Sequence, residues 1–172
     1  SSLAIWRRRL PAKVWDNSDA EFVPAKGWQY KRKAFESSEL ALDVAGQSIK
    51  LLLHLQNSGQ VGVFPEHAQY LPQIARQLEG RAEKPRVLNL FAYTGLASLW
   101  CAKLGASVTH IDISKKAIDW ARENVALNQD LKGEIRFIVE DAIKYLEREA
   151  RRQSQYDLII ADPPSFSRVS NK

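Results

Sequence analysis

The stretch Asn89–Trp100, NLFAYTGLASLW, decides the fold of this chain. Its first residues end an apolar run over residues 86–91, which is typical of a buried strand. Gly95 then separates this run from a helical apolar pattern that continues to Gly105. Because glycine permits tight backbone turns, the stretch predicts a strand, a turn and a helix in immediate succession.

The same alternation of apolar runs and helical patterns continues along the chain. Further strands are expected at residues 107–113, 134–139 and 156–162, and further helices at residues 115–128 and 142–153. Ser114 and Asp141 precede these two helices and can cap them. Short apolar strands that alternate with helices predict an α/β fold, a parallel sheet with helices on both faces.

A different pattern precedes this alternation. Residues 36–66 predict a small β meander, with strands in residues 39–46, 47–56 and 61–64, and a helix is expected in residues 66–80, beginning or kinking near Pro72. We therefore expect an N-terminal segment with the meander over residues 1–66. Residues 67–172 would then belong to the α/β domain.

Positive charge is concentrated at the start of the chain. Residues 1–35 hold eight lysines and arginines against three acidic residues, which accounts for the whole formal net charge of +5. Aromatic side chains alternate with these cations, as in proteins that bind phosphates and unstacked bases. This basic segment, residues 1–35, is therefore a candidate for contact with RNA, although a solvated face over a small core would have the same composition.

Other classes of protein fit the composition less well. The sequence has no run of 18 apolar residues, so no membrane-spanning helix and no membrane partner are expected. Cys101 is the sole cysteine, which excludes an internal disulfide and fits a cytoplasmic location. No metal site is assigned, and the sequence does not specify an oligomeric state.

Side chains suited to ligand binding follow the ends of the predicted strands. Ligands of such sheets bind outside the carboxyl ends of the strands. Gly95 allows close approach of the backbone, and Asp112 is placed to bind ribose hydroxyls. Asp141 could reach an adenine amino group or only cap a helix. Two prolines after Asp162 make a rigid turn that holds this carboxylate at the mouth of the site.

The motifs VLNLFAYTG, HIDIS, EDA and ADPPSF, in this order, resemble those of class I S-adenosylmethionine-dependent methyltransferases. More narrowly, they resemble the bacterial group that modifies bases of large-subunit ribosomal RNA and carries a D-P-P-x-F motif. The resemblance covers about residues 60–168. It implies a Rossmann-like class I sheet of which the first four parallel strands are present, so that residues 67–172 would be the N-terminal half of a domain that is incomplete at its C-terminus. It also implies S-adenosyl-L-methionine as the cofactor.

The resemblance also implies roles for individual residues. Asp112 would bind the ribose and Asp141 the adenine. The remaining cofactor-binding candidates lie in GVFPEH, in the first motif and after the second strand: Phe64, Pro65, Glu66, Asn89, Phe91, Ala92, Thr94, Gly95 and Ser114. The catalytic candidates line the target pocket: Asp162, Pro163, Pro164 and Phe166.

The methyl acceptor remains open between a guanine nitrogen and cytosine C5, because Ser165 separates the D-P-P turn from Phe166. Cytosine C5 would require a cysteine nucleophile, and Cys101 lies mid-helix, where a packing role is expected. A methyltransferase acting on a protein or small molecule is the alternative. An NAD-dependent oxidoreductase is more remote, since a single glycine and the D-P-P turn do not match a dinucleotide site. A non-catalytic RNA-binding module is also remote, because Gly95, Asp112 and Asp162 are intact.

Overall fold

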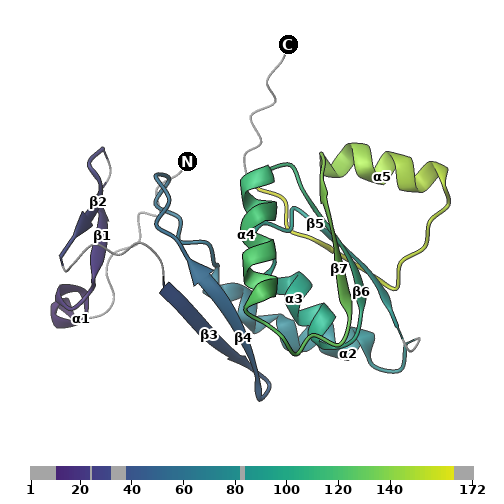
Figure 1. The fold of residues 1–172 in the computed structure, drawn as a ribbon, viewed down its shortest axis with the longest axis horizontal. Coiled ribbons are helices and arrows are strands. Elements are labelled where there is room, and N and C mark those ends of the chain that lie inside the picture. The colour runs from purple at the N-terminus through teal and green to yellow at the C-terminus, as the bar shows by residue number, and fades with distance from the viewer. Residues whose placement is uncertain (1–10, 24, 32–37, 82–83, 165–172) are drawn as a thin grey trace, which may run out of the picture. The chain divides into compact units, whose positions relative to one another are not determined.

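The computed structural model describes residues 11–23, 25–31, 38–81 and 84–164 (Figure 1). Its contacts divide the chain into two compact units. Unit 1 comprises residues 1–38 and 54–61, and unit 2 comprises residues 39–53 and 62–172. Residues 39–53 thus pack with the α/β part of the chain. The domain boundary expected after residue 66 stays a prediction.

Unit 1 contains short elements that the sequence pattern did not indicate. These are α1 (Ala12–Asp16), β1 (Ala20–Val23) and β2 (Gly27–Tyr30), and the two strands are antiparallel. The Phe22 ring meets the Trp28 ring edge-on at 5.3 Å between centroids. The Trp28 indole N–H donates to the Gln56 carbonyl at 2.8 Å. These contacts tie residues 54–61 to the β1–β2 pair.

Unit 2 is built on a four-stranded parallel sheet, which confirms the predicted α/β fold. The strands are β5 (Arg86–Leu90), β6 (Ser107–Asp112), β7 (Glu134–Val139) and β8 (Leu158–Ala161). They lie in the order β7-β6-β5-β8. All four end at the same edge, which we call the carboxyl edge; it lies at the top of Figure 1.

Helices cover both faces of this sheet, as expected. α5 (Ala142–Arg151) packs Ala142 and Tyr145 against Leu88, Leu90 and Ile111 on one face. α3 (Leu96–Lys103) and α4 (Lys115–Ala126) lie on the other face. There Asn89 and His110 contact Ser98 of α3, and Arg122 of α4 lies over the Phe137 ring of β7.

The strands β3 (Ser38–Val44) and β4 (Gln47–Leu53) form a hairpin through Ala45 and Gly46, both with positive φ. Side chains of α4 and the residues after it bind the β4 backbone. The Trp120 indole donates to the Leu52 carbonyl, and Asn124 accepts from the Leu52 N–H. Asn128 both accepts from and donates to the Lys50 backbone. The Asn124 and Asn128 side chains thus satisfy backbone groups of β4 that would otherwise need a neighbouring strand as a partner.

Two sequence predictions need correction. Residues 61–64 are not a strand, so the expected meander is a hairpin followed by irregular chain. The helix expected over 66–80 is two elements: the 3-10 helix η1 (Pro65–Gln69) and α2 (Leu71–Leu78). The break follows from the prolines, because Pro72 lies in the first turn of α2, where its missing N–H is tolerated. Among the described residues, no helix is both long and apolar enough to cross a membrane.

Candidate functional site

The loop after β5 has an unusual backbone. Phe91, Tyr93 and Gly95 have φ values of 55°, 49° and 93°, all in the left-handed region. For a non-glycine residue this conformation costs on the order of 1–3 kcal/mol. The loop is held by hydrogen bonds to β6, among them the Ala92 N–H bond to the Ile111 carbonyl at 3.0 Å. Such strain is retained where surrounding contacts determine the backbone, as they do at binding sites.

Asp112 at the end of β6 binds this loop directly. One carboxylate oxygen accepts from the Tyr93 N–H at 2.9 Å, and the other accepts from the Ser114 N–H at 2.8 Å. Each oxygen retains acceptor capacity, because a carboxylate oxygen has two lone pairs. The carboxylate is thus fixed at the carboxyl edge with room for two more donors, such as the hydroxyls of a ribose.

Thr94 connects the loop to the segment before η1. Its hydroxyl donates to the Gly62 carbonyl at 2.6 Å, and its own carbonyl accepts from the Asn124 side chain at 2.8 Å. A Cβ on Gly62 would lie 1.9 Å from the Trp120 ring, so only glycine fits there. This packing brings the Phe64 ring to 5.6 Å from the Tyr93 ring. GVFPEH thus lies against the loop in unit 2. Its expected place beside the cofactor stays a prediction.

A second cluster connects η1 with the end of β8. His67 Nε2 lies 3.1 Å from Asp162 Oδ2. The His67 ring has Phe64 at 5.3 Å and Tyr70 at 5.1 Å between centroids. Burial raises the pKa of Tyr70 to about 12, and the charges of Asp162 and Glu66 contribute in the same direction. Tyr70 therefore stays neutral beside the carboxylate.

Two predicted helix caps are present at the same edge. The Ser114 hydroxyl accepts from the Ala117 N–H, and one Asp141 oxygen accepts from the N–H groups of Ile143 and Lys144. Of the two roles considered for Asp141, helix capping is thus realised. The adenine contact stays a prediction.

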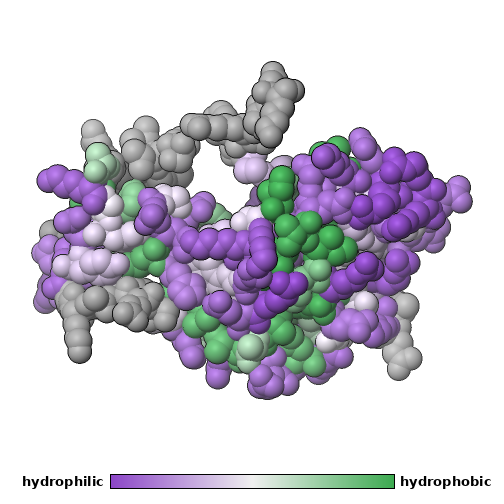
Figure 2. All heavy atoms as spheres, turned by 45° about the horizontal axis from the view of Figure 1, so that its top comes forward, coloured by the Kyte–Doolittle hydropathy of each residue, from purple (hydrophilic) through white to green (hydrophobic). Residues whose placement is uncertain are grey.

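Apolar side chains are exposed beside these polar groups. Ile113 follows Asp112 and is 72% exposed, and Ile143 follows Asp141 by two residues and is 57% exposed. Val139, the last residue of β7, is 48% exposed. Figure 2 turns the carboxyl edge toward the reader and shows hydrophobic surface there. An apolar surface next to hydrogen-bonding groups suits a flat aromatic ring such as adenine.

Two of the expected loop residues face the interior. The Asn89 side chain is buried and donates to Ser98 Oγ, which in turn contacts His110 Nδ1 at 3.0 Å. Burial lowers the pKa of His110 to about 4, so the ring is neutral at pH 7. Phe91 packs its side chain against the core beneath α5. Only the backbone of Phe91 is therefore suited to contact a ligand.

The other expected site residues differ in their surroundings. Pro65, Glu66, Pro163 and Pro164 are exposed near the His67–Asp162 pair, whereas Ala92 is half-buried. Phe166 and Ser165 lie outside the described residues. Cys101 is fully buried within α3, and burial raises its thiol pKa to about 12, as its predicted packing role requires.

Sequence reasoning missed His67, Tyr70, Tyr93, Ile113 and Ile143. His67 and Tyr70 are spaced by three residues after Phe64, a pattern that places three rings on one side of a turn. No sequence pattern marks the two isoleucines, because a single exposed apolar side chain is common.

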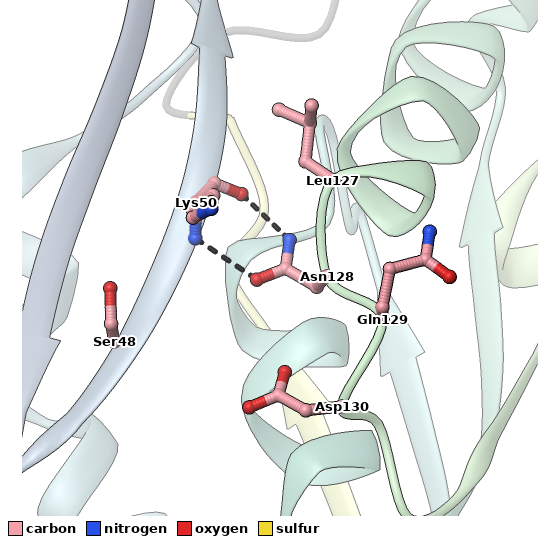
Figure 3. Close-up of a pocket in the computed structure, with 6 residues that line it drawn as sticks. All are labelled: Ser48, Lys50, Leu127, Asn128, Gln129 and Asp130. Carbon is pink, nitrogen blue, oxygen red and sulfur yellow. Dashed lines mark hydrogen bonds between the residues drawn. The ribbon is translucent and has the colours of Figure 1, made fainter.

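A shallow pocket lies away from the carboxyl edge. It is lined by Ser48 and Lys50 of β4 and by residues 127–130 after α4 (Figure 3). The Asn128 amide is bound to the Lys50 backbone, and Asp130 accepts from Lys103 at 2.6 Å. Asn128 thus serves the docking of the hairpin and Asp130 pairs with α3, so this hollow is not the candidate site.

Comparison with protein families gives one match over most of the chain. The profile of the S-adenosylmethionine-dependent methyltransferase family matches residues 33–171. A relative from Pseudoalteromonas atlantica, named ribosomal RNA large subunit methyltransferase K/L, is 41% identical over 144 residues. The match covers 83% of this chain and 19% of the relative. The chain thus spans about a fifth of the length of the curated relatives it matches.

Solved structures agree with this match. An S-adenosylmethionine-dependent methyltransferase from Agrobacterium tumefaciens is 43% identical and superposes with a TM-score of 0.82, covering 96% of this chain and 53% of that one. The protein SMU.776, solved in complex with SAH, is 27% identical with a TM-score of 0.65. That match covers 83% of this chain and 36% of SMU.776.

Proposed function

Because the chain belongs to the S-adenosylmethionine-dependent methyltransferase family, we propose that it binds S-adenosylmethionine and methylates a base of large-subunit ribosomal RNA. The family, the Rossmann-like fold and the cofactor expected from the sequence motifs are confirmed by these matches. The RNA substrate is inferred from relatives named for that reaction. A ribosomal substrate would place the protein in the cytoplasm.

The observation that carries the proposal is the position of Asp112. Its carboxylate is fixed by the Tyr93 and Ser114 N–H groups at the carboxyl edge, beside a strained loop. We infer that it binds the ribose hydroxyls. Ile113 and Ile143 would then cover the adenine faces, since both are exposed at that edge.

The loop fits S-adenosylmethionine better than a dinucleotide. A dinucleotide site requires glycines that let the backbone approach a pyrophosphate. Here Phe91 and Tyr93 occupy the left-handed positions, and their side chains pack against the core and against Phe64 and Trp120. The Tyr93 and Phe64 rings would instead line the space for the methionine end of the cofactor.

Catalysis would consist mainly of alignment. S-adenosylmethionine supplies an electrophilic methyl group on a sulfonium. The residues of the D-P-P turn, with Asp162 at its start, would hold the acceptor base at attack distance. Asp162 would accept a hydrogen bond from the acceptor group and take up the proton that it releases. Phe166 would stack on the base.

Two measurements test the proposal. Isothermal titration calorimetry with S-adenosylmethionine and with NAD compares the two cofactors, and only S-adenosylmethionine should bind. Transfer of a tritiated methyl group to ribosomal RNA from a strain lacking the protein tests the substrate. Binding of NAD, or methylation of protein in place of RNA, would contradict the proposal.

A further inference from the structure

The pair formed by His67 and Asp162 carries an inference that rests on the proposed function. The two side chains come from η1 and from the end of β8, and their nearest atoms are 3.1 Å apart. The Asp162 side chain is 62% exposed, whereas the His67 side chain is 24% exposed. An exposed carboxylate is thus held by a partner that is itself mostly covered.

The His67 ring is held by its neighbours. Phe64 and Tyr70 each lie within 5.3 Å of it between ring centroids, at tilted angles. Phe64 also contacts Tyr93 of the loop after β5. A ring packed between two others keeps one orientation, so its nitrogen presents a fixed donor to the carboxylate.

We propose that His67 is a positioning residue for Asp162, whose Oδ2 accepts from the His67 Nε2–H while Oδ1 stays available to the methyl acceptor. Without this bond the exposed carboxylate would rotate and lose the geometry that attack requires. In the reaction the acceptor atom bonds to the methyl carbon, the carbon–sulfur bond breaks with its electron pair going to sulfur, and the released proton passes to Oδ1. His67 keeps its own hydrogen throughout.

The test distinguishes three roles for the His67 side chain: a fixed hydrogen-bond donor, a proton carrier, and a ring that serves only packing. In the intact protein, His67→Leu removes the donor, and His67→Gln keeps an N–H donor that cannot shuttle protons. Gln69→Leu, on the exposed side of η1, is the matched control. Single-turnover methyl transfer and S-adenosylmethionine affinity are measured for each. An NMR signal of a protected imidazole N–H is sought in wild type and Asp162→Ala.

We expect His67→Leu to slow transfer by about 10-fold or more, with cofactor affinity changed less than about 2-fold. His67→Gln should recover most of the rate, and Gln69→Leu should match wild type. The N–H signal should be present in wild type and lost in Asp162→Ala.

Three results would overturn the inference. If His67→Gln and His67→Leu lose the same share of the transfer rate, the imidazole ring itself is needed. If the transfer rate and the cofactor affinity fall together, His67 has a structural role. An N–H signal that persists in Asp162→Ala would mean that the pair does not form. A wild type that binds S-adenosylmethionine but methylates no RNA would instead refute the proposed substrate, whatever the N–H signal shows.

Discussion

At the scale of single residues, Asp112 has a structural and a binding role at once. Its carboxylate accepts from the Tyr93 N–H and so stabilises a loop in which Phe91 and Tyr93 are strained. The same oxygens are the expected ribose ligands. A change at this residue should therefore affect both loop geometry and cofactor affinity.

Asp112→Ala should weaken S-adenosylmethionine binding by about 1–3 kcal/mol, because a charged acceptor and the support of the loop are both removed. Calorimetric titration of the folded variant measures this. Asp119→Ala is the control, since Asp119 lies nearby on α4 but pairs with Lys115 and Arg122. Wild-type affinity in Asp112→Ala would remove this residue from the cofactor site.

Gly62 and Gly105 differ in packing but share a backbone conformation. Their φ values are 95° and 98°, yet a Cβ would meet the Trp120 ring only at Gly62. Gly62→Ala should therefore lower the free energy of unfolding of unit 2 by about 1–3 kcal/mol more than Gly105→Ala does. Chemical denaturation of both variants measures the difference. Equal losses would mean that backbone strain, and not contact with Trp120, requires the glycine.

His110 makes the stability depend on pH. Its pKa is lowered from 6.5 to about 4 by burial, so the unfolded chain binds a proton at pH values where the native chain does not. The contribution of His110 to the free energy of unfolding is therefore fully present above pH 6.5 and is lost as the pH decreases toward 4. Between pH 7 and pH 5 the loss from this group should be about 2 kcal/mol.

Urea denaturation at several pH values checks this prediction. His110→Gln should be less stable at pH 7 but should lose less stability on acidification. Gln69→Leu, which removes no titratable group, should retain the wild-type decrease. The range above pH 5 is chosen because carboxylates with lowered pKa values, such as those of Glu140 and Glu134, stay ionised there. An unchanged decrease in His110→Gln would refute the assignment.

At the scale of elements, α4 holds the hairpin and the loop together. Trp120 and Asn124 of α4, and Asn128 just after it, are spaced by four residues and lie on the same side. They bind the β4 backbone at Leu52 and Lys50, and Asn124 also donates to the Thr94 carbonyl. The helix therefore links β4 to the loop that carries the proposed cofactor contacts.

Asn124→Leu should destabilise unit 2 by about 2–5 kcal/mol, because the half-buried Leu52 N–H and the buried Thr94 carbonyl each lose a partner. It should also weaken S-adenosylmethionine binding through Thr94. Denaturation and calorimetry measure the two effects. Gln129→Ala is the control, since its side chain makes only an exposed local hydrogen bond. A stable variant would show that these amides are dispensable.

At the scale of the whole molecule, the excess of positive charge and the α/β sheet lie in different parts of the chain. Unit 2 carries the carboxyl edge with the candidate site. The basic segment, residues 1–35, carries the whole net charge. We propose that this segment supplies RNA affinity, while cofactor binding depends on unit 2 alone.

Replacing Arg7, Arg8 and Arg9 with glutamine should flatten the salt dependence of RNA binding. For single-stranded RNA the slope of log K against log salt should change by up to about 2, because each phosphate contact contributes about 0.7. S-adenosylmethionine affinity should stay at the wild-type value. Titrations at several salt concentrations measure the slope, and an unchanged slope would remove these arginines from the RNA contact.

The sequence predicted the parts of the fold that depend on local pattern. The four strands and three helices from Arg86 onward, with caps at Ser114 and Asp141, follow from apolar periodicity and capping chemistry. The elements α1, β1 and β2 were missed because they are too short to show a period. Residues 61–64 form an apolar run, which predicts a strand, but such a run equally suits an irregular segment that packs on Trp120, as Gly62 does.

The sequence by itself determined the family, the order of the elements from Arg86 onward and the positions of Asp112 and Asp162 at strand ends. Tertiary structure alone decided which groups meet there: the Tyr93 N–H with Asp112, Thr94 with Gly62, and His67 with Asp162. It also showed that Asn89 points into the core. The physical reason is that strand periodicity is a local property, whereas hydrogen bonds between distant segments depend on how the helices and strands pack.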